Sequence, residues 1–256
     1  MRKLLLTLIL VSLVPVLSSY GGAIEDKSLV LYLNFDEGSG DEVQDLSQYG
    51  NNGTLQGDPK WVDGKYEKAL EFEDETSYVE VANSDSLNFG EAVTMMCWAY
   101  SRAWEGDGDQ WIDKGAHDNK PSCYGIMVYQ QANLYIMAGD GAARHDLITP
   151  DVPPTEEWYH IAGVCDGESL RIYLNGELHA ESKDSFAFVS DNALPLQIGR
   201  GVNRPQYSFT GIIDDVLVYN RALAQDEIKE VMEGELLSVD RVGKFSTTWG
   251  NIKSGQ

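Results

Sequence analysis

Short segments rich in β-branched, aromatic and aliphatic residues recur along most of this chain, and polar, glycine-containing stretches separate them. The segments lie at 28–35, 69–72, 78–81, 93–100, 124–129, 133–138, 158–165, 170–174, 194–199 and 211–219. One of them runs directly into Asn175-Gly176, a pair that favours the tight turn of a β-hairpin because both residues tolerate positive φ. Roughly ten short strands at regular spacing are typical of a β-sandwich or barrel.

A helical pattern is recognisable after the N-terminal region only at 222–232 (ALAQDEIKEVM). Leu223, Ile228, Val231 and Met232 form a partial apolar stripe there. Because no helices alternate with the strands, a doubly wound α/β enzyme is not expected. The pattern predicts an all-β fold with one short C-terminal helix.

The N-terminus has the features of an export signal in their usual order. Arg2 and Lys3 precede an apolar run at 4–17, and mostly small residues follow up to position 23. The run is shorter than the ~20 residues that span a bilayer, and its flanks fit a signal peptide better than the alternative, a buried N-terminal helix. We therefore expect a signal peptide at 1–23, one β-sandwich domain at 24–233 and a polar tail at 234–256. The product would be secreted, extracellular or periplasmic, with no transmembrane anchor after cleavage.

The chain is strongly acidic, with 41 Asp and Glu against 19 Lys and Arg and a net charge of −22. Nucleic acid is not an expected partner, because phosphate binding depends on basic side chains. The charge is compatible with divalent cations, and it also serves simple solvation.

The three cysteines are Cys97, Cys123 and Cys165. Export would permit a disulfide, but an odd number leaves at least one thiol unpaired and three pairings are open. The alternative is three partly buried thiols that pack as small hydrophobic side chains.

Several segments resemble, in order and spacing, the laminin G-like family of the concanavalin A-like lectin/glucanase superfamily, in the form found in exported bacterial proteins. They are LYLNFDEGSG (31–40), DLSQYGNNGTLQG (45–57), GKYEKALEFEDETSYVEV (64–81), VTMMCWA (93–99), KG (114–115), EWYHIAGVCDG (157–167), LRIYLNGE (170–177) and GIIDDVLVYNRALAQDEI (211–228). The chain departs from the family pattern at Gln48, Tyr49, Cys165 and Ala224, and Ala224 removes a side-chain N-cap from the helix. The resemblance implies an antiparallel two-sheet β-sandwich of the jelly-roll type.

The resemblance also implies a structural Ca²⁺ near the chain ends, since such sandwiches often hold one there. Asp36, Asp45, Asn51 and Asp214 are the candidate ligands, and carboxylate and amide oxygens suit this hard cation. Alternatively, Asp36 and Asp45 are turn residues that bond to their own backbone. A second acidic run, EGDGDQ at 105–110, lacks the full spacing of an EF-hand and is interpreted as a plain loop.

A ligand would bind to loops at one edge of the sandwich, because loops on a rigid scaffold carry function. The candidate loops are 102–110, 115–122, 139–150 and 199–207. Sugars are bound by aromatic stacking and by polar groups, and the side chains of that kind are Trp104, Arg144, His145, Arg200, Asn203 and Tyr207. Each of them is also explained as an ordinary surface residue.

An enzyme is the least favoured class. Glu71, Glu73 and Glu75 share one strand face, as glycosidase carboxylates do, but this acidic run lacks the Asp of the glucanase motif. No GxSxG, HExxH or phosphate loop is present. The sequence thus predicts a secreted, non-catalytic module that recognises carbohydrate; the alternatives are a protein–protein adhesion module and, less favoured, a glycoside hydrolase.

Overall fold

The computed structural model describes residues 26–104, 108–115, 123–130 and 133–234. The predicted signal peptide and nearly all of the predicted tail lie outside these residues. Among the described residues, no helix is long and apolar enough to cross a membrane.

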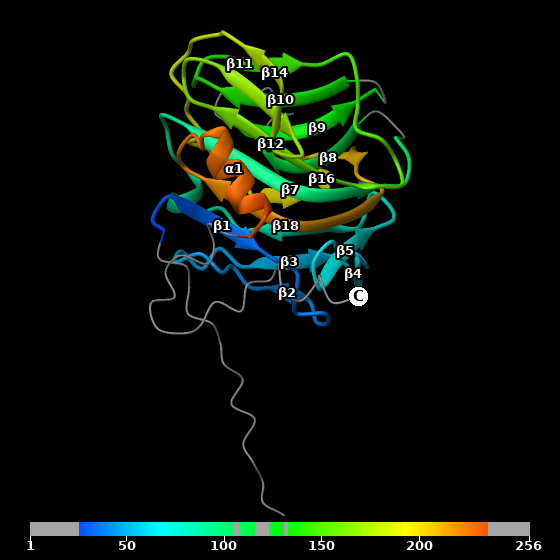
Figure 1. The fold of residues 1–256 in the computed structure, drawn as a ribbon. Helices are drawn as coiled ribbons and strands as arrows, with labels where there is room; N and C mark the ends of the chain where they lie inside the picture. Colours follow the sequence, from blue (N-terminus) through cyan, green and yellow to red (C-terminus); the bar gives the residue numbers. More distant parts are fainter. Residues whose placement is uncertain (1–25, 105–107, 116–122, 131–132, 235–256) are drawn as a thin grey trace, which may run out of the picture.

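Two antiparallel sheets form the body of the molecule (Figure 1). The first sheet has the strand order β14 (Glu177–Ser182), β13 (Leu170–Leu174), β12 (Trp158–Cys165), β7 (Val93–Ser101), β18 (Gly211–Tyr219), β5 (Lys68–Phe72) and β4 (Lys60–Asp63), with β1 (Leu29–Leu33) also paired to β18. The second sheet has the order β11 (Arg144–Ile148), β10 (Asn133–Gly139), β9 (Tyr124–Tyr129), β8 (Gly108–Lys114), β15 (Leu196–Ile198), β6 (Tyr78–Val81), β3 (Gly53–Gln56) and β2 (Glu42–Val43). This architecture confirms the predicted sandwich.

The core lies between the two sheets and takes alternate residues from each strand. Val79 and Val81 of β6 and Leu196 and Ile198 of β15 are fully buried in it. Their neighbours in sequence therefore point to the outer face of the second sheet. This alternation decides which polar side chains meet on that outer face.

Strand β7 is buried on both faces, which explains its continuous apolar run. Cys97 belongs to the core, whereas Met96 lies on the other face, beneath the helix α1 (Gln225–Met232). Ile228 and Val231 of α1 pack there, and Figure 1 shows the helix lying over the strands of the first sheet. The helix begins three residues later than predicted. As expected, Ala224 provides no side-chain cap, although its N–H donates to Glu227 Oε2 at 2.8 Å.

The predicted hairpin turn is confirmed, with φ of 50° at Asn175 and 77° at Gly176. The candidate loops at 102–110, 139–150 and 199–207 also hold strands: β8, β11 and the two-stranded ribbon of β16 (Arg200–Gly201) and β17 (Arg204–Ser208). Residues 105–107 and 116–122 of the candidate loops lie outside the described residues. All three cysteines are buried free thiols, so no disulfide forms among them.

Candidate functional site

Asp45 organises a turn and has no oxygen left for a metal ion. Its Oδ1 accepts the N–H groups of Tyr32 and Ser47, both at 2.9 Å, and its Oδ2 accepts the Ser47 hydroxyl at 2.6 Å and the Asn51 N–H at 2.7 Å. Asn51 is committed too, because its amide donates to Val30 O and accepts from Ser84 Oγ, both at 2.7 Å. These two predicted calcium ligands therefore act as hydrogen-bonding centres, the alternative that the sequence also offered for Asp45.

Asp36 and Asp214 belong to a separate acidic cluster that also includes Asp215. Asp214 Oδ2 accepts the N–H of Tyr66 at 3.0 Å, while its Oδ1 is buried and has no hydrogen-bond partner. Asp215 Oδ1 accepts the Tyr32 hydroxyl at 2.8 Å. Burial raises the pKa of both Asp214 and Asp215, and the neighbouring carboxylates raise these values further. Partial desolvation likewise raises the pKa of Asp36 to about 6.

The backbone around this acidic cluster is strained. Phe35, Glu67 and Asp215 have φ values of 56°, 35° and 47°, in the left-handed region that non-glycine residues avoid. The pairing of β18 with β7 also shifts register after Asp214. Such bulges and strained residues concentrate at functional sites.

The four predicted calcium ligands thus divide into two pairs, and only one pair fits a cation. Each Asp36 oxygen accepts one hydrogen bond, from Asn34 or Lys68, and Asp214 Oδ1 is buried without a partner. By contrast, each Asp45 oxygen accepts two hydrogen bonds and the Asn51 amide is fully used. Among the described residues, no three His, Cys, Asp or Glu side chains stand together in an arrangement that would hold a metal ion by themselves. Backbone carbonyls or water would have to complete a calcium site here.

Three of the six predicted ligand residues come together on the β16–β17 ribbon, which lies on the outer face of the second sheet. The N–H of Val202, between the two strands, donates to the buried Asp113 Oδ2 of β8 at 2.7 Å. The ribbon carries Arg200, Asn203 and Tyr207. It divides this outer face into one area over β15, β6 and β3 and another over β9 and β10.

On the first of these areas, Arg200 covers an aromatic ring. Its guanidinium carbon lies 3.5 Å from the centroid of the Tyr78 ring. Beside this pair, Gln197 Nε2 donates to Glu80 Oε2 at 2.8 Å, and Arg200 Nε donates to Gln197 Oε1 at 3.4 Å. Gln197 pairs directly with Glu80 across the strands, so the register of β15 and β6 brings these groups together. We name Tyr78, Glu80, Gln197 and Arg200 the arginine–tyrosine patch.

On the other area, Tyr207 takes part in a group of tyrosines. Its ring lies 6.1 Å from that of Tyr129, which in turn lies 5.6 Å from Tyr135, both in edge-to-face geometry. Beneath them, Met127 and Met137 are buried. These side chains come from β9, β10 and β17, so the aromatic group depends on the ribbon folding over the sheet.

Of the other three predicted ligand residues, Trp104 and His145 lie elsewhere, whereas Arg144 lies close enough to Tyr135 of the tyrosine group for its charge to act on the Tyr135 pKa. Trp104 packs against Trp111 and Tyr159 of the core, and its indole N–H donates to Pro153 O at 3.0 Å. Arg144 forms an ion pair with Asp146 on edge strand β11, at 2.8 Å. Neither residue is brought near Arg200 by the register of the sheet.

His145 bridges two carboxylates. Its Nε2 lies 2.9 Å from Asp140 Oδ2 and its Nδ1 lies 2.8 Å from Asp184 Oδ2, while its ring stacks on Phe186 at 3.8 Å. Burial lowers the pKa of His145, but the two carboxylates outweigh this effect and raise it overall. With both ring nitrogens facing carboxylates, the cationic imidazolium fits this position best.

The acidic run that resembled a glycosidase motif is engaged in surface ion pairs. Glu71 pairs with Arg102 and Glu73 pairs with Lys60. His160 is fully buried against Trp98, and burial lowers its pKa to about 3. Neither arrangement resembles a pair of carboxylates facing each other across an open site.

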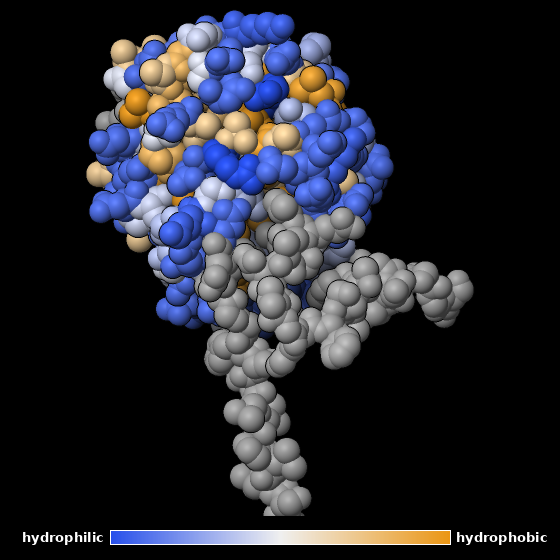
Figure 2. All heavy atoms as spheres, turned by 60° about the vertical axis from the view of Figure 1, so that its left-hand side comes forward, coloured by the Kyte–Doolittle hydropathy of each residue, from blue (hydrophilic) through white to orange (hydrophobic). Residues whose placement is uncertain are grey.

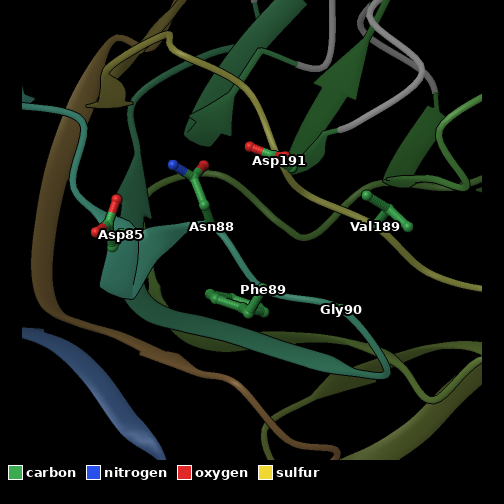
Figure 3. Close-up of a pocket in the computed structure, with 6 residues that line it drawn as sticks. All are labelled: Asp85, Asn88, Phe89, Gly90, Val189 and Asp191. Carbon is green, nitrogen blue, oxygen red and sulfur yellow. The ribbon is translucent and has the colours of Figure 1, made fainter.

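A hollow that the sequence did not predict lies at one edge of the sandwich (Figure 3), with a volume of about 410 Å³. It is lined by Asp85, Asn88, Phe89, Gly90, Val189 and Asp191. The two segments that form it are about a hundred residues apart in sequence. The acidic and aromatic residues of 85–91 could have indicated a binding site from the sequence. Nothing in the sequence indicates which distant segment lies against them.

Comparisons with known proteins agree with this fold. The model of the concanavalin A-like lectin/glucanases superfamily matches residues 73–229. The N,N-dimethylformamidase beta subunit of Alcaligenes sp is 24% identical over 208 residues, which cover 69% of this chain but only 26% of that protein.

Three solved structures illustrate the likeness in fold. The binding domain of Paraclostridial Mosquitocidal Protein 1 has a TM-score of 0.65 at 19% identity, covering 81% of this chain and 52% of that one. Domain 4 of AbnA, a GH43 extracellular arabinanase from Geobacillus stearothermophilus in complex with arabinotriose, has a TM-score of 0.63 at 19% identity, covering 80% and 98%. The botulinum neurotoxin serotype G binding domain has a TM-score of 0.65 at 14% identity, covering 79% and 50%. From its strand order and from the match over residues 73–229, this chain belongs to the concanavalin A-like lectin/glucanases superfamily.

Proposed function

We propose that this chain is a non-catalytic module that binds a neutral oligosaccharide on the outer face of its second sheet. The observation that carries the proposal is the arginine–tyrosine patch, where Arg200 stacks on Tyr78 beside the hydrogen-bonded pair of Gln197 and Glu80. A flat guanidinium over a ring offers a sugar both a stacking surface and N–H donors, and the half-buried Glu80 carboxylate offers an acceptor for hydroxyl groups.

The charge of the chain supports a neutral ligand. With a net charge of −22, the protein repels anionic glycans over distances comparable to the Debye length. In Figure 2 hydrophilic residues cover most of the forward face, with hydrophobic residues in small groups between them. The tyrosine group around Tyr207 would extend the site across the ribbon, because aromatic faces bind sugar rings.

The solved structures support a carbohydrate ligand in general. One of them is an arabinanase domain in complex with arabinotriose, and another concerns a botulinum neurotoxin whose cell entry depends on two ganglioside molecules. The chain spans only about a quarter of the dimethylformamidase subunit. That relative therefore does not support a catalytic role for this domain.

The test is glycan-array binding, followed by titration calorimetry with the best neutral oligosaccharide and with arabinotriose as the first probe. Arg200→Ala and Tyr207→Ala should each weaken binding about tenfold, as the loss of one stacked or charge-assisted contact does. Arg102→Ala, which removes an exposed arginine from the first sheet, is the matched control and should leave affinity unchanged. The absence of glycan binding by the wild-type chain would overturn the proposal.

A protein partner is the second candidate, and one observation favours it. Ile148 on β11 and Leu178 on β14 are each 47% exposed, and these edge strands close the two sheets on the same side of the sandwich. Exposed aliphatic side chains on neighbouring edges suit protein contacts. If no glycan binds, the test is capture of a purified protein partner by the wild-type chain. Loss of that capture in the Leu178→Glu variant would establish adhesion.

A structural Ca²⁺ forms part of the proposal, and two of the four predicted ligands are retained for it. Asp36 and Asp214 would supply the side-chain ligands, backbone carbonyls or water would complete the site, and the cation would supply positive charge to the unpartnered Asp214 Oδ1. It would link the loop after β1 to β18 and thereby join the two ends of the domain. Export through the signal peptide remains the proposed route to the calcium-rich exterior.

A further inference from the structure

The edge hollow is built on a firm backbone. Gly90 and Val189 form an antiparallel bridge, the N–H of Ser190 donates to Phe89 O at 2.9 Å, and the N–H of Phe89 donates to Ser190 Oγ at 3.0 Å. The Phe89 ring stacks on the buried Tyr124 with a centroid distance of 5.6 Å. The aromatic wall of the hollow is therefore anchored to the core.

A buried ammonium holds the two walls together from below. Lys114 is completely buried, and its Nζ lies within 2.7–3.2 Å of five oxygens, none of them from a carboxylate. Those oxygens belong to Asn83 and Asn88 on one wall and to Asn192 and Leu194 on the other. Burial lowers the pKa of Lys114 to about 8, so the ammonium form prevails at neutral pH. This charge-assisted cage presets the width of the hollow.

The carboxylates at the rim remain available. Asp85 and Asp191 are exposed, and neither side chain makes a hydrogen bond or an ion pair with the residues that the structure describes. Among the described residues, none of those that line the hollow is basic, although the buried Lys114 ammonium beneath them interacts electrostatically with Asp191. Asn88 is already committed, since its Oδ1 accepts from Lys114 and its amide donates to Asn83 Oδ1 at 3.0 Å. The rim thus offers acceptors only, beside an aromatic ring (Figure 3).

We propose that this hollow is a second binding site, for a sugar that carries a free ammonium group. Asp85 and Asp191 would accept hydrogen bonds from the ammonium and the adjacent hydroxyl groups, and the Phe89 ring would contact the apolar face of the sugar and attract the charge. A volume of about 410 Å³ suits one or two sugar rings. The site is separate from the arginine–tyrosine patch and does not depend on it.

The test compares two trisaccharides that differ only at the amine, glucosamine trimer and its fully N-acetylated counterpart. Titration calorimetry is done at mildly acid pH, where the amine of the sugar is protonated. The amine form should bind about tenfold more tightly, the difference expected for one charge-assisted contact. Asp191→Asn and Asp85→Asn should each remove most of that preference, whereas the exposed Asp58→Asn should preserve it.

Three outcomes would overturn the proposal. One is equal affinity for the two trisaccharides, and another is a preference that survives in the Asp85→Asn/Asp191→Asn double variant. The third is that a lysine amide acetylated at its α-amino group binds as tightly as the glucosamine trimer. That result would show a general site for ammonium groups such as those of protein lysines. Arg200→Ala should leave the amine preference intact, so failure here is distinguishable from failure of the proposed oligosaccharide site.

Discussion

The guanidinium carbon of Arg200 lies 3.5 Å from the centroid of the Tyr78 ring, although 121 residues separate them in sequence (200 − 78 − 1). Arg200 starts the ribbon that folds over the second sheet, and Tyr78 starts a strand within that sheet. The pair exists because β15, immediately before Arg200, is paired with β6. It places a stacked cation on the outer face of the second sheet.

Replacing Arg200 by Lys should weaken oligosaccharide binding nearly as much as replacing it by Ala. A lysine keeps the charge, but it lacks the flat guanidinium that stacks on Tyr78 and presents several N–H groups in one plane. We expect a loss of about fivefold to tenfold, measured by titration calorimetry. Full retention of affinity in Arg200→Lys would show that charge alone acts there.

Replacing Asp45 by Ala should strongly destabilise the fold. The change leaves four donors without their acceptor, three of them the backbone N–H groups of Tyr32, Ser47 and Asn51. We expect a loss of about 3–5 kcal/mol in the free energy of unfolding, measured with urea. The exposed Asp41, four residues earlier, is the control, and Asp41→Ala should change stability by less than about 0.5 kcal/mol. A small effect at Asp45 would contradict its role as the centre of the turn.

The melting temperature in excess calcium should be several degrees higher than the melting temperature in EDTA. The reason is that a ligand that binds only the folded state stabilises it. Asp214→Asn should abolish the difference, since it removes the charge at the unpartnered oxygen. A variant at Asp45 that still folds should retain a calcium response. Equal melting temperatures for the wild-type chain in both buffers would exclude a tight calcium site at the acidic cluster.

His145 should make stability fall as the pH rises. Its folded pKa is raised above the unfolded value, so the folded state holds its proton more tightly. The stabilisation is therefore complete below an unfolded pKa of about 6.5 and is lost as the pH rises through the higher folded pKa. Urea unfolding across this range should show a decline that His145→Gln removes. An identical pH profile in the variant would contradict the ion pairs with Asp140 and Asp184.

Replacing Lys114 by Met should destabilise the protein and impair the edge hollow. The change leaves the oxygens of Asn83, Asn88 and Asn192 without their shared donor. We expect a loss of about 2–4 kcal/mol in the free energy of unfolding. Binding of the amine-bearing trisaccharide should weaken in the same variant, while binding at the arginine–tyrosine patch should be kept. Unchanged stability would show that the ammonium cage contributes little.

Strands with a regular apolar pattern were predictable from the sequence, but several strands with other patterns were not, among them β14 and β8. β14 (ELHAES) lies at a sheet edge and is mostly exposed, so it has no apolar face. β8 (GDQWIDK) is buried along its whole length yet carries polar residues, because Asp113 accepts a hydrogen bond from the ribbon above it. From the sequence alone, a polar residue in the middle of a strand suggests a loop. Only the structure shows which group forms the hydrogen bond that allows the residue to be buried.

The sequence by itself determined the sandwich, the Asn175-Gly176 turn and the C-terminal helix, because alternation, turn chemistry and helical periodicity act between near neighbours. Only the tertiary structure decided which polar side chains meet. It joined Asp45 to Asn51 in one hydrogen-bonded turn, and it placed Asp36 with Asp214 in another cluster. It also gathered Lys114 with two distant loops. Such contacts depend on strand register and on crossovers between strands far apart in sequence, and a local pattern carries no record of either.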